Sequence, residues 1–108
     1  MSVDIFCGFP FNVASYALLT YMICEVINND PEYKNDRLRP GELTIHLGDL
    51  HLYEDHYEQA ILQYLRCPFE FPHLLIKNLR YNLVDFEFED FELVDHKTHG
   101  AILAKMVA

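Results

Sequence analysis

Residues 4–23 read DIFCGFPFNVASYALLTYMI, and this stretch decides the fold. Apolar and partly β-branched residues over 3–9 predict a short strand, which Gly8 and Pro10 end. Good helix formers follow over 13–27, with apolar residues on nearly every face. A helix that is apolar all round is a buried one, so we expect a strand that leads into a long buried helix.

The rest of the chain supplies one more helix and several strands. Residues 28–41 are polar and broken by Pro and Gly, which predicts a long loop. Residues 54–66 place apolar residues at helical spacing and predict a shorter, amphipathic helix. Gly48-Asp49 is typical of a turn or a bulge. Strands are predicted at 42–47, 74–79, 85–94 (alternatively a turn and a strand) and 101–107. Two helices among about five strands indicate an α+β fold, and 108 residues indicate a single domain over 1–108.

Composition limits the classes of partner. Hydrophobic residues make up 51% of the chain and aromatic residues 14%, so part of the apolar surface is expected to face a partner or another segment. The net charge of −9 argues against binding nucleic acid or an anionic membrane, because both require clustered Lys and Arg.

The cysteines and the N-terminal residues indicate a cytoplasmic protein. Cys7, Cys24 and Cys67 are odd in number and lack paired spacing, which predicts free thiols in a reducing compartment. The opening MSVDIF has no basic segment or cleavage site of a secretory signal. No apolar run reaches the roughly 18 residues of a membrane span, so no membrane association is expected.

A few polar residues have the chemistry of a binding site. His51 and Tyr53 are two apart, on one face of an extended segment, where both can donate to one hydroxyl group of a sugar. Asn12 offers donors and an acceptor that suit the edge of a uracil-like ring, and Asp4 can orient water. Each has a structural alternative: Asn12 as a helix N-cap, Asp4 as a turn residue or a strand-end hydrogen-bond acceptor, and His51 with Tyr53 in a structural role.

Other polar clusters are interpreted as structural. The spacing of His46, His51 and His56 with Asp49 and Asp55 fits no familiar ligand pattern, so no metal is predicted. The acidic run from Asp85 to Asp90 is typical of a solvated strand face. Cys7 is interpreted as a small buried apolar residue.

Four ordered blocks resemble the thymidylate synthase family: DIFCGFPFNVASYALLTYMI, GDLHLYEDH, FEFEDFEL and the terminal HG-AIL-AKMVA. The resemblance is to the C-terminal part of that enzyme and implies an incomplete α+β domain with a mixed sheet. The family methylates deoxyuridylate to thymidylate, with methylene-tetrahydrofolate as carbon donor and reductant. The resemblance thus implies these two ligands.

The resemblance also implies site residues. Asn12 matches the asparagine that reads the pyrimidine edge, His51 and Tyr53 match the pair that holds the deoxyribose, and Ser2 matches a phosphate-side serine. The folate side is matched by Asp4, Gly8 and Phe11, and the closing tail by Met106, Val107 and Ala108.

The sequence departs from the family at the catalytic nucleophile and at one arginine. It has no Pro-Cys-His motif, which carries the family's nucleophile, and Met1 stands where the family has an arginine. No catalytic residue is therefore assigned, with Asn12 and Asp4 in supporting roles. We expect a C-terminal half that is active only with a complementing N-terminal half, or a homo-oligomer formed through the sheet. The alternatives are a non-catalytic remnant or interaction subunit, and part of a pyrimidine hydroxymethylase.

Overall fold

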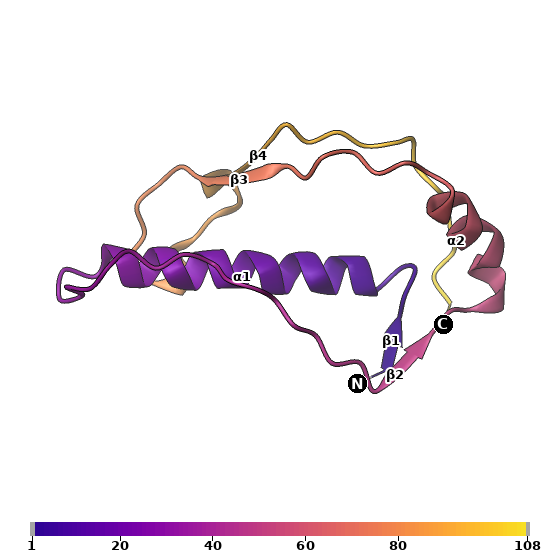
Figure 1. Ribbon diagram of the computed structural model, residues 1–108, viewed down its shortest axis with the longest axis horizontal. Helices are drawn as coiled ribbons and strands as arrows, with labels where there is room; N and C mark the ends of the chain where they lie inside the picture. The colour runs from indigo at the N-terminus through magenta and orange to yellow at the C-terminus, as the bar shows by residue number, and fades with distance from the viewer. Residues whose placement is uncertain (1, 108) are drawn as a thin grey trace. The chain divides into compact units, whose positions relative to one another are not determined.

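The computed structural model (Figure 1) describes residues 2–107, which divide into two compact units. Unit 1 holds the described residues up to Ser15, Thr44–Phe69 and the described residues from Thr98 on; unit 2 holds Tyr16–Leu43 and Glu70–Lys97. The helices are α1 (Phe9–Asn29) and α2 (Tyr57–Tyr64), with 3-10 turns at Glu54–His56, Leu83–Asp85 and Phe88–Asp90. The strands are β1 (Ser2–Asp4), β2 (Asp49–His51), β3 (His73–Ile76) and β4 (Phe91–Val94). The mixture of helices and small sheets confirms the α+β class, whereas the single domain over 1–108 stays a prediction.

Unit 1 is organised around the parallel pairing of β1 with β2, in which Asp4 lies opposite His51. Val3, 2% exposed, is the one fully buried apolar side chain among residues 2–107. The predicted strand over 3–9 is wrong beyond Asp4, because the chain turns there. The Asp4 carboxylate accepts from the Phe6 N–H (3.0 Å) and the Asp4 carbonyl from the Gly8 N–H (3.2 Å).

Helix α1 begins four residues earlier than predicted. Pro10 does not only end the strand: it lies in the first turn of α1, where its missing N–H costs nothing. Asn12 is therefore inside the helix and is not its N-cap, which corrects that interpretation. Its backbone N–H donates to the Gly8 carbonyl (3.2 Å).

The long helix is less buried than its sequence predicts. None of its residues is fully buried, so the expectation of a buried helix is wrong for the chain by itself. By length and composition α1 passes the test for a membrane span, with a mean hydropathy of 1.3, which corrects the expectation that no segment reaches that length. The core helices of soluble proteins share this length and composition.

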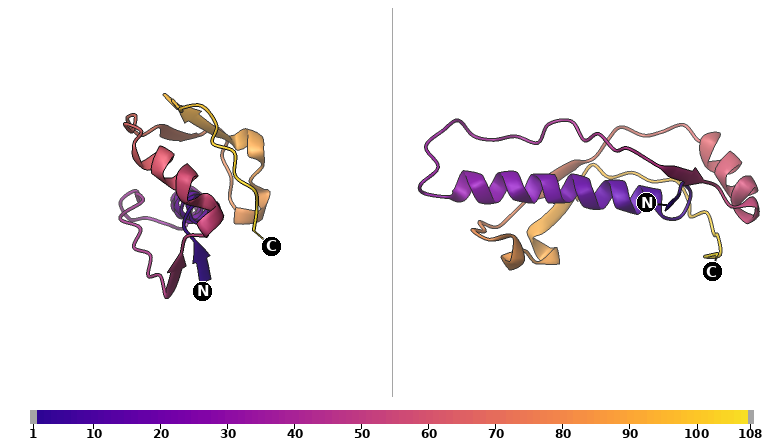
Figure 2. Two further views of the ribbon diagram at one scale, coloured as in Figure 1. Left: turned by 90° about the vertical axis from the view of Figure 1, so that its right-hand side faces the viewer. Right: turned by 90° about the horizontal axis from the view of Figure 1, so that it is seen from below.

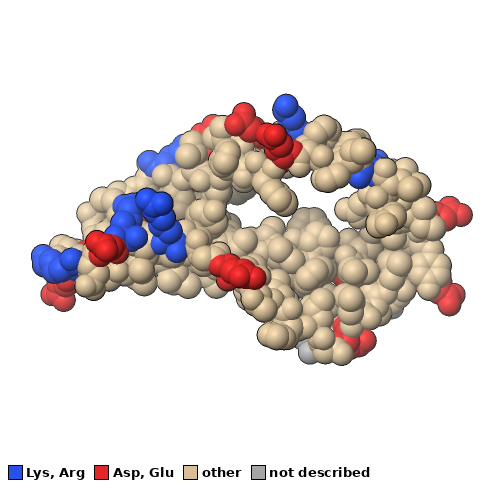
Figure 3. Space-filling model, viewed as in Figure 1, with Lys and Arg blue, Asp and Glu red and all other residues tan. Residues whose placement is uncertain are grey.

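The predicted loop after α1 is present and extends further than expected. No helix or strand is described between Asn29 and Asp49, so the strand predicted at 42–47 is wrong. Gly48-Asp49 is not a separate turn either, because Asp49 already pairs in β2. In unit 2 the loop returns alongside α1 (Figure 2), where the Asn28 side chain donates to the Leu38 carbonyl (2.9 Å) and accepts from its N–H (2.7 Å). Arg37 pairs with Glu25 at 2.8 Å, and charged side chains gather over this loop (Figure 3).

Asn28→Ala should open this loop without unfolding the protein. Two hydrogen bonds worth about 1 kcal/mol each are lost, so trypsin should cleave after Arg37 on the order of 10-fold faster. Limited proteolysis followed by mass spectrometry measures the rate, with Asn82→Ala, which breaks a local hydrogen bond elsewhere, as the control. Equal cleavage rates in the two variants would contradict the assigned role of Asn28.

Unit 2 also holds the antiparallel pair β3–β4, in which Ile76 lies opposite Phe91. The strand predicted at 74–79 is confirmed over 74–76, and 85–94 follows the alternative of a turn and a strand. The turn forms because Asp90 is buried (1% exposed), where it accepts from Asn78, Arg80 and the Glu87 N–H. The interpretation of the acidic run as a solvated face is therefore wrong at Asp90.

The C-terminal segment of unit 1 forms no strand over 101–107, contrary to the prediction. Side chains hold it instead: Arg66 donates to the Gly100 carbonyl (2.7 Å) and His56 to the Lys105 carbonyl (2.7 Å). His99 stacks on Phe69, with ring centroids 4.5 Å apart. Met1, which stands where the family has an arginine, and Ala108, which matches the closing tail, lie outside the described residues.

Candidate functional site

The strand pair β1–β2 and the residues just after it bring together three of the side chains that the sequence nominated. Ser2 and His51 meet across the pair, with 3.4 Å between Ser2 Oγ and His51 Nδ1. The His51 and Tyr53 rings pack edge to face, with centroids 4.9 Å apart. The three polar groups thus gather from positions 49 residues apart in sequence, and both His51 and Tyr53 retain exposed surface.

The turn after β1 positions Asp4 and Gly8. The hydrogen bond from the Phe6 N–H makes Asp4 a turn residue, as its structural alternative predicted, and also fixes the direction of the carboxylate. A Cβ at Gly8 would lie 3.3 Å from the Asp4 carbonyl oxygen, closer than most Cβ contacts. A glycine here lets α1 start close to the end of β1.

Asn12 and Phe11 lie in the first turns of α1. The Asn12 side chain is half-buried and makes no hydrogen bond to other protein atoms within residues 2–107. Its amide donors and acceptor are therefore available to a ligand. Phe11 is 76% exposed, and its ring lines a cavity.

That cavity, of about 400 Å³, lies wholly within unit 1. Its walls are mostly apolar, with Arg66 and Gln63 as polar members; the lining is Phe6, Cys7, Pro10, Phe11, Gln63, Arg66, Ile102, Ala104 and Met106. An apolar wall with one cation suits a flat ring system that carries a carboxylate. Met106, predicted in the closing tail, does line the cavity.

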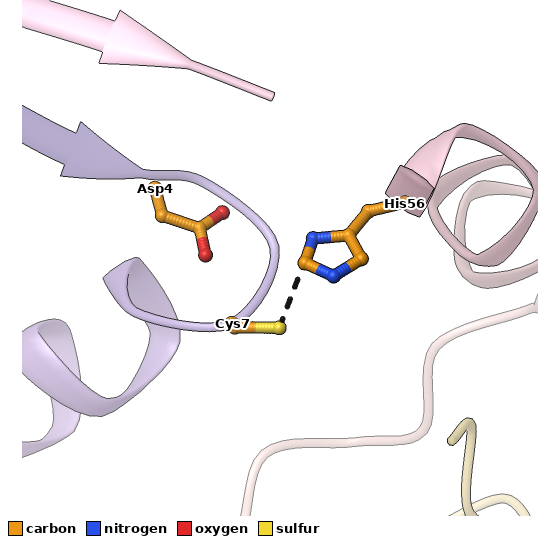
Figure 4. A group of neighbouring side chains, drawn as sticks. All are labelled: Asp4, Cys7 and His56. Atoms are coloured by element: carbon orange, nitrogen blue, oxygen red, sulfur yellow. Dashed lines mark hydrogen bonds between the residues drawn. The ribbon is translucent and has the colours of Figure 1, made fainter. Parts of the chain in front are cut away.

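Asp4, Cys7 and His56 form a cluster that the sequence analysis missed (Figure 4). One ligand atom from each lies within 4.8 Å of the others, and His56 is 1% exposed. Burial, and next the charge of Asp4, raise the pKa of the Cys7 thiol. Asp4 and Cys7 are three residues apart, but nothing in the sequence placed His56 beside them.

The other two histidines considered as metal ligands, His46 and His51, do not belong to this cluster. His51 Nδ1 lies 3.9 Å from an Asp49 oxygen, at the limit of an ion pair. Of His46, His51 and His56, only His56 belongs to a group of three possible ligands within the part of the chain that is described.

A comparison with models of protein families shows which family the chain matches. Residues 1–108 match the family described as Thymidylate synthase. The match covers the whole chain, and the polar strand pair, the first turns of α1 and the apolar cavity all lie within it. On that match, the chain belongs to the thymidylate synthase family.

Proposed function

We propose that this chain provides the pyrimidine and deoxyribose contacts for methylation of deoxyuridylate to thymidylate. The observation that carries the proposal is the β1–β2 pair, where Ser2, His51 and Tyr53 gather. His51 and Tyr53 offer hydrogen bonds to the deoxyribose 3′-hydroxyl, and Ser2 offers one to the phosphate. Asn12, whose side-chain amide has no hydrogen-bond partner among residues 2–107, reads the pyrimidine edge.

Thymidylate synthases generally use methylene-tetrahydrofolate as co-substrate. When bound, this co-substrate supplies the carbon unit and the reducing equivalents. The cavity fits its chemistry, because Phe11 offers a ring face and Arg66 a cation for a carboxylate. Asp4, beside the Gly8 turn, is proposed to accept hydrogen bonds from the ring, and the tail residues Met106 and Val107 to exclude water.

The nucleophile is proposed to come from a different segment. Attack on the pyrimidine needs an activated thiolate, and none of the three cysteines stands in a Pro-Cys-His sequence. Burial and the Asp4 carboxylate disfavour the thiolate of Cys7. A net charge of −9 also leaves the phosphate in need of further cations. The nucleophile and the further cations are proposed to lie on a segment with a Pro-Cys-His sequence, which is either joined to this chain or separate from it. The reaction is proposed to take place in the cytoplasm.

Reconstitution tests the proposal. The chain is mixed with the N-terminal segment of a thymidylate synthase that carries Pro-Cys-His, and tritium release from [5-³H]deoxyuridylate is followed. Release is expected only when both segments and methylene-tetrahydrofolate are present, because methylation replaces the hydrogen at C5. No release from a mixture shown by native mass spectrometry to be assembled would overturn the proposal.

The double substitution His51→Ala with Tyr53→Phe should reduce the rate of that release. Losing the hydrogen bonds to the sugar is expected to cost on the order of 100-fold in kcat/KM. His46→Ala, at an exposed loop position, is the matched control and should retain activity. Unchanged rates in the double variant would favour the alternative of a non-catalytic interaction subunit.

One observation fits that alternative as well as the catalytic role. Many large apolar side chains are exposed in the chain by itself, among them Phe71, Val84, Phe88 and Leu103. Family members generally form homodimers, and such a surface suits burial against another subunit. An interaction role and a catalytic role both place this surface in an interface, so the kinetic tests above separate them.

A further inference from the structure

We propose that Asp4, Cys7 and His56 form a binding site for a divalent cation of the zinc type. The site goes beyond the proposed synthase function, since neither nucleotide nor folate is needed to form it. All three residues lie in unit 1. Asp4 ends β1, Cys7 lies in the turn between β1 and α1, and His56 faces them from the 3-10 turn that precedes α2 (Figure 4).

The distances suit one shared cation. Cys7 Sγ lies 3.9 Å from His56 Nδ1, and a carboxylate oxygen of Asp4 completes a set within 4.8 Å. Zinc bonds of about 2.3 Å to sulfur and about 2.0 Å to nitrogen place these two ligand atoms roughly 3.6 Å apart at a tetrahedral angle. Binding therefore requires a small approach of Cys7 and His56, together with an adjustment of the Asp4 carboxylate toward them.

The hydrogen bond on the far side of the His56 ring prepares Nδ1 as a ligand. His56 Nε2 lies 2.7 Å from the Lys105 carbonyl oxygen, which can only accept, so Nε2 carries the proton. In the neutral ring Nδ1 is then unprotonated, with its lone pair toward Cys7. A backbone carbonyl that fixes the second nitrogen is a common support for metal-binding histidine.

The surroundings hold Asp4 and the His56 ring in place. The Phe6 N–H holds the Asp4 carboxylate in place at 3.0 Å, and the Phe6 ring packs 5.6 Å from the His56 ring. His56 is 1% exposed, so its ring is shielded from water. A site held by neighbouring side chains in this way needs little ordering when a cation arrives.

Asp4 distinguishes a metal site from a nucleophilic Cys–His pair. A negative carboxylate near the thiol opposes formation of a free thiolate, which a nucleophile requires. With a divalent cation the same carboxylate is favourable, because Asp4 and a Cys7 thiolate together balance its two positive charges. On binding, the thiol proton leaves to solvent as the metal–sulfur bond forms.

The ligand types indicate the kind of cation. One thiolate, one imidazole and one carboxylate are typical of zinc, whereas magnesium and calcium prefer oxygen alone. Three protein ligands leave the fourth tetrahedral position open to water or to another ligand. Cys7 also lines the cavity of about 400 Å³, so that position has a nearby route to solvent.

Cobalt titration of the untagged, reduced chain tests the site, with Co²⁺ as the spectroscopic substitute for Zn²⁺. We expect one equivalent to bind with a sulfur-to-cobalt absorption band in the near ultraviolet, and Zn²⁺ to abolish the band. Cys7→Ser should remove the band, and Asp4→Asn should weaken cobalt affinity by about 10-fold or more. Cys67→Ser is the control, because Cys67 is an exposed free thiol and should leave the spectrum unchanged.

A second measurement keeps the test decisive if a variant folds poorly. In the unmodified chain, Zn²⁺ should slow alkylation of Cys7 by iodoacetamide and leave that of Cys67 unchanged, as peptide mass spectrometry reports. A band that persists in Cys7→Ser, or Cys7 alkylation unaffected by millimolar Zn²⁺, would overturn the proposal. Neither measurement uses deoxyuridylate, so failure here is distinguishable from failure of the synthase function.

Discussion

Asp90→Ala is expected to lower the unfolding temperature by roughly 10 °C or more, the largest effect on stability at any position considered. Asp90 accepts hydrogen bonds from Asn78 Nδ2 (2.7 Å), from both Arg80 Nε and its terminal nitrogen (2.9 Å each) and from the Glu87 N–H (2.8 Å). Alanine leaves all these donors without their acceptor. Thermal unfolding followed by circular dichroism measures the change.

Glu89→Ala provides the matched control, because Glu89 is an exposed acid in the same turn and should shift the midpoint little. A pH series adds a second check. The hydrogen bond from Arg80, then those from Glu87 and Asn78, hold the pKa of Asp90 well below its ordinary value of 3.8. Since the folded-state pKa is depressed, the stabilisation is fully present above the ordinary pKa and is lost as the pH falls below it.

The unmodified chain should therefore lose stability below about pH 4 more steeply than Asp90→Asn, which has no carboxylate to protonate there. Equal slopes for the two proteins would mean that the Asp90–Arg80 pair does not contribute to folding. A normal midpoint in Asp90→Ala would contradict the larger prediction.

The sequence predicts which elements exist better than where they begin. The apolar runs before and after residue 10 indicate a strand and a helix, and both are present. Their boundary was misplaced because Pro10 has two valid interpretations, as the end of a strand and as a first-turn helix residue. Only the Asp4-to-Phe6 and Asp4-to-Gly8 hydrogen bonds decide between them.

Strand predictions failed where pairing had to be supplied by another segment. Residues 42–47 and 101–107 have suitable patterns, but no strand is described there and the second segment is held by side chains instead. An alternating pattern indicates a face to bury and does not name the partner strand. The sequence of α1 likewise indicates apolar faces to bury without naming the partner. The helix was therefore predicted to be buried, but it has no buried residue in this chain.

The candidate site was predictable in its members but not in its contacts. Asn12, His51 and Tyr53 could be nominated from side-chain chemistry and from the ordered blocks that resemble the family. The meeting of Ser2 with His51, and of Cys7 with His56, depends on long-range pairing of segments 49 residues apart. Single-sequence patterns carry no such information, so the Asp4–Cys7–His56 cluster could not have been foreseen.

Asn12→Asp is expected to reverse the base preference of the reconstituted enzyme, and this is the largest expected effect on function. The asparagine amide both donates and accepts, which matches the N3–H donor and O4 acceptor of uracil. Aspartate offers oxygen acceptors to the cytosine amino group and opposes the uracil O4. A buried polar mismatch of this kind costs on the order of 10²–10⁴ in kcat/KM, so the ratio for deoxycytidylate over deoxyuridylate should rise at least 100-fold.

Tritium release from the two 5-³H nucleotides, assayed with the same Pro-Cys-His segment, gives that ratio directly. Asn12→Ala is the matched control: it removes the amide without adding a carboxylate, so it should slow the uracil reaction without favouring cytosine. A ratio that stays constant in Asn12→Asp would remove Asn12 from base reading. Mass analysis of the product separates the synthase from a hydroxymethylase, because a methyl and a hydroxymethyl group differ by one oxygen. A hydroxymethylated product from the unmodified chain would replace the synthase proposal, whereas a methylated one with reversal in Asn12→Asp supports both the reaction and the role of Asn12.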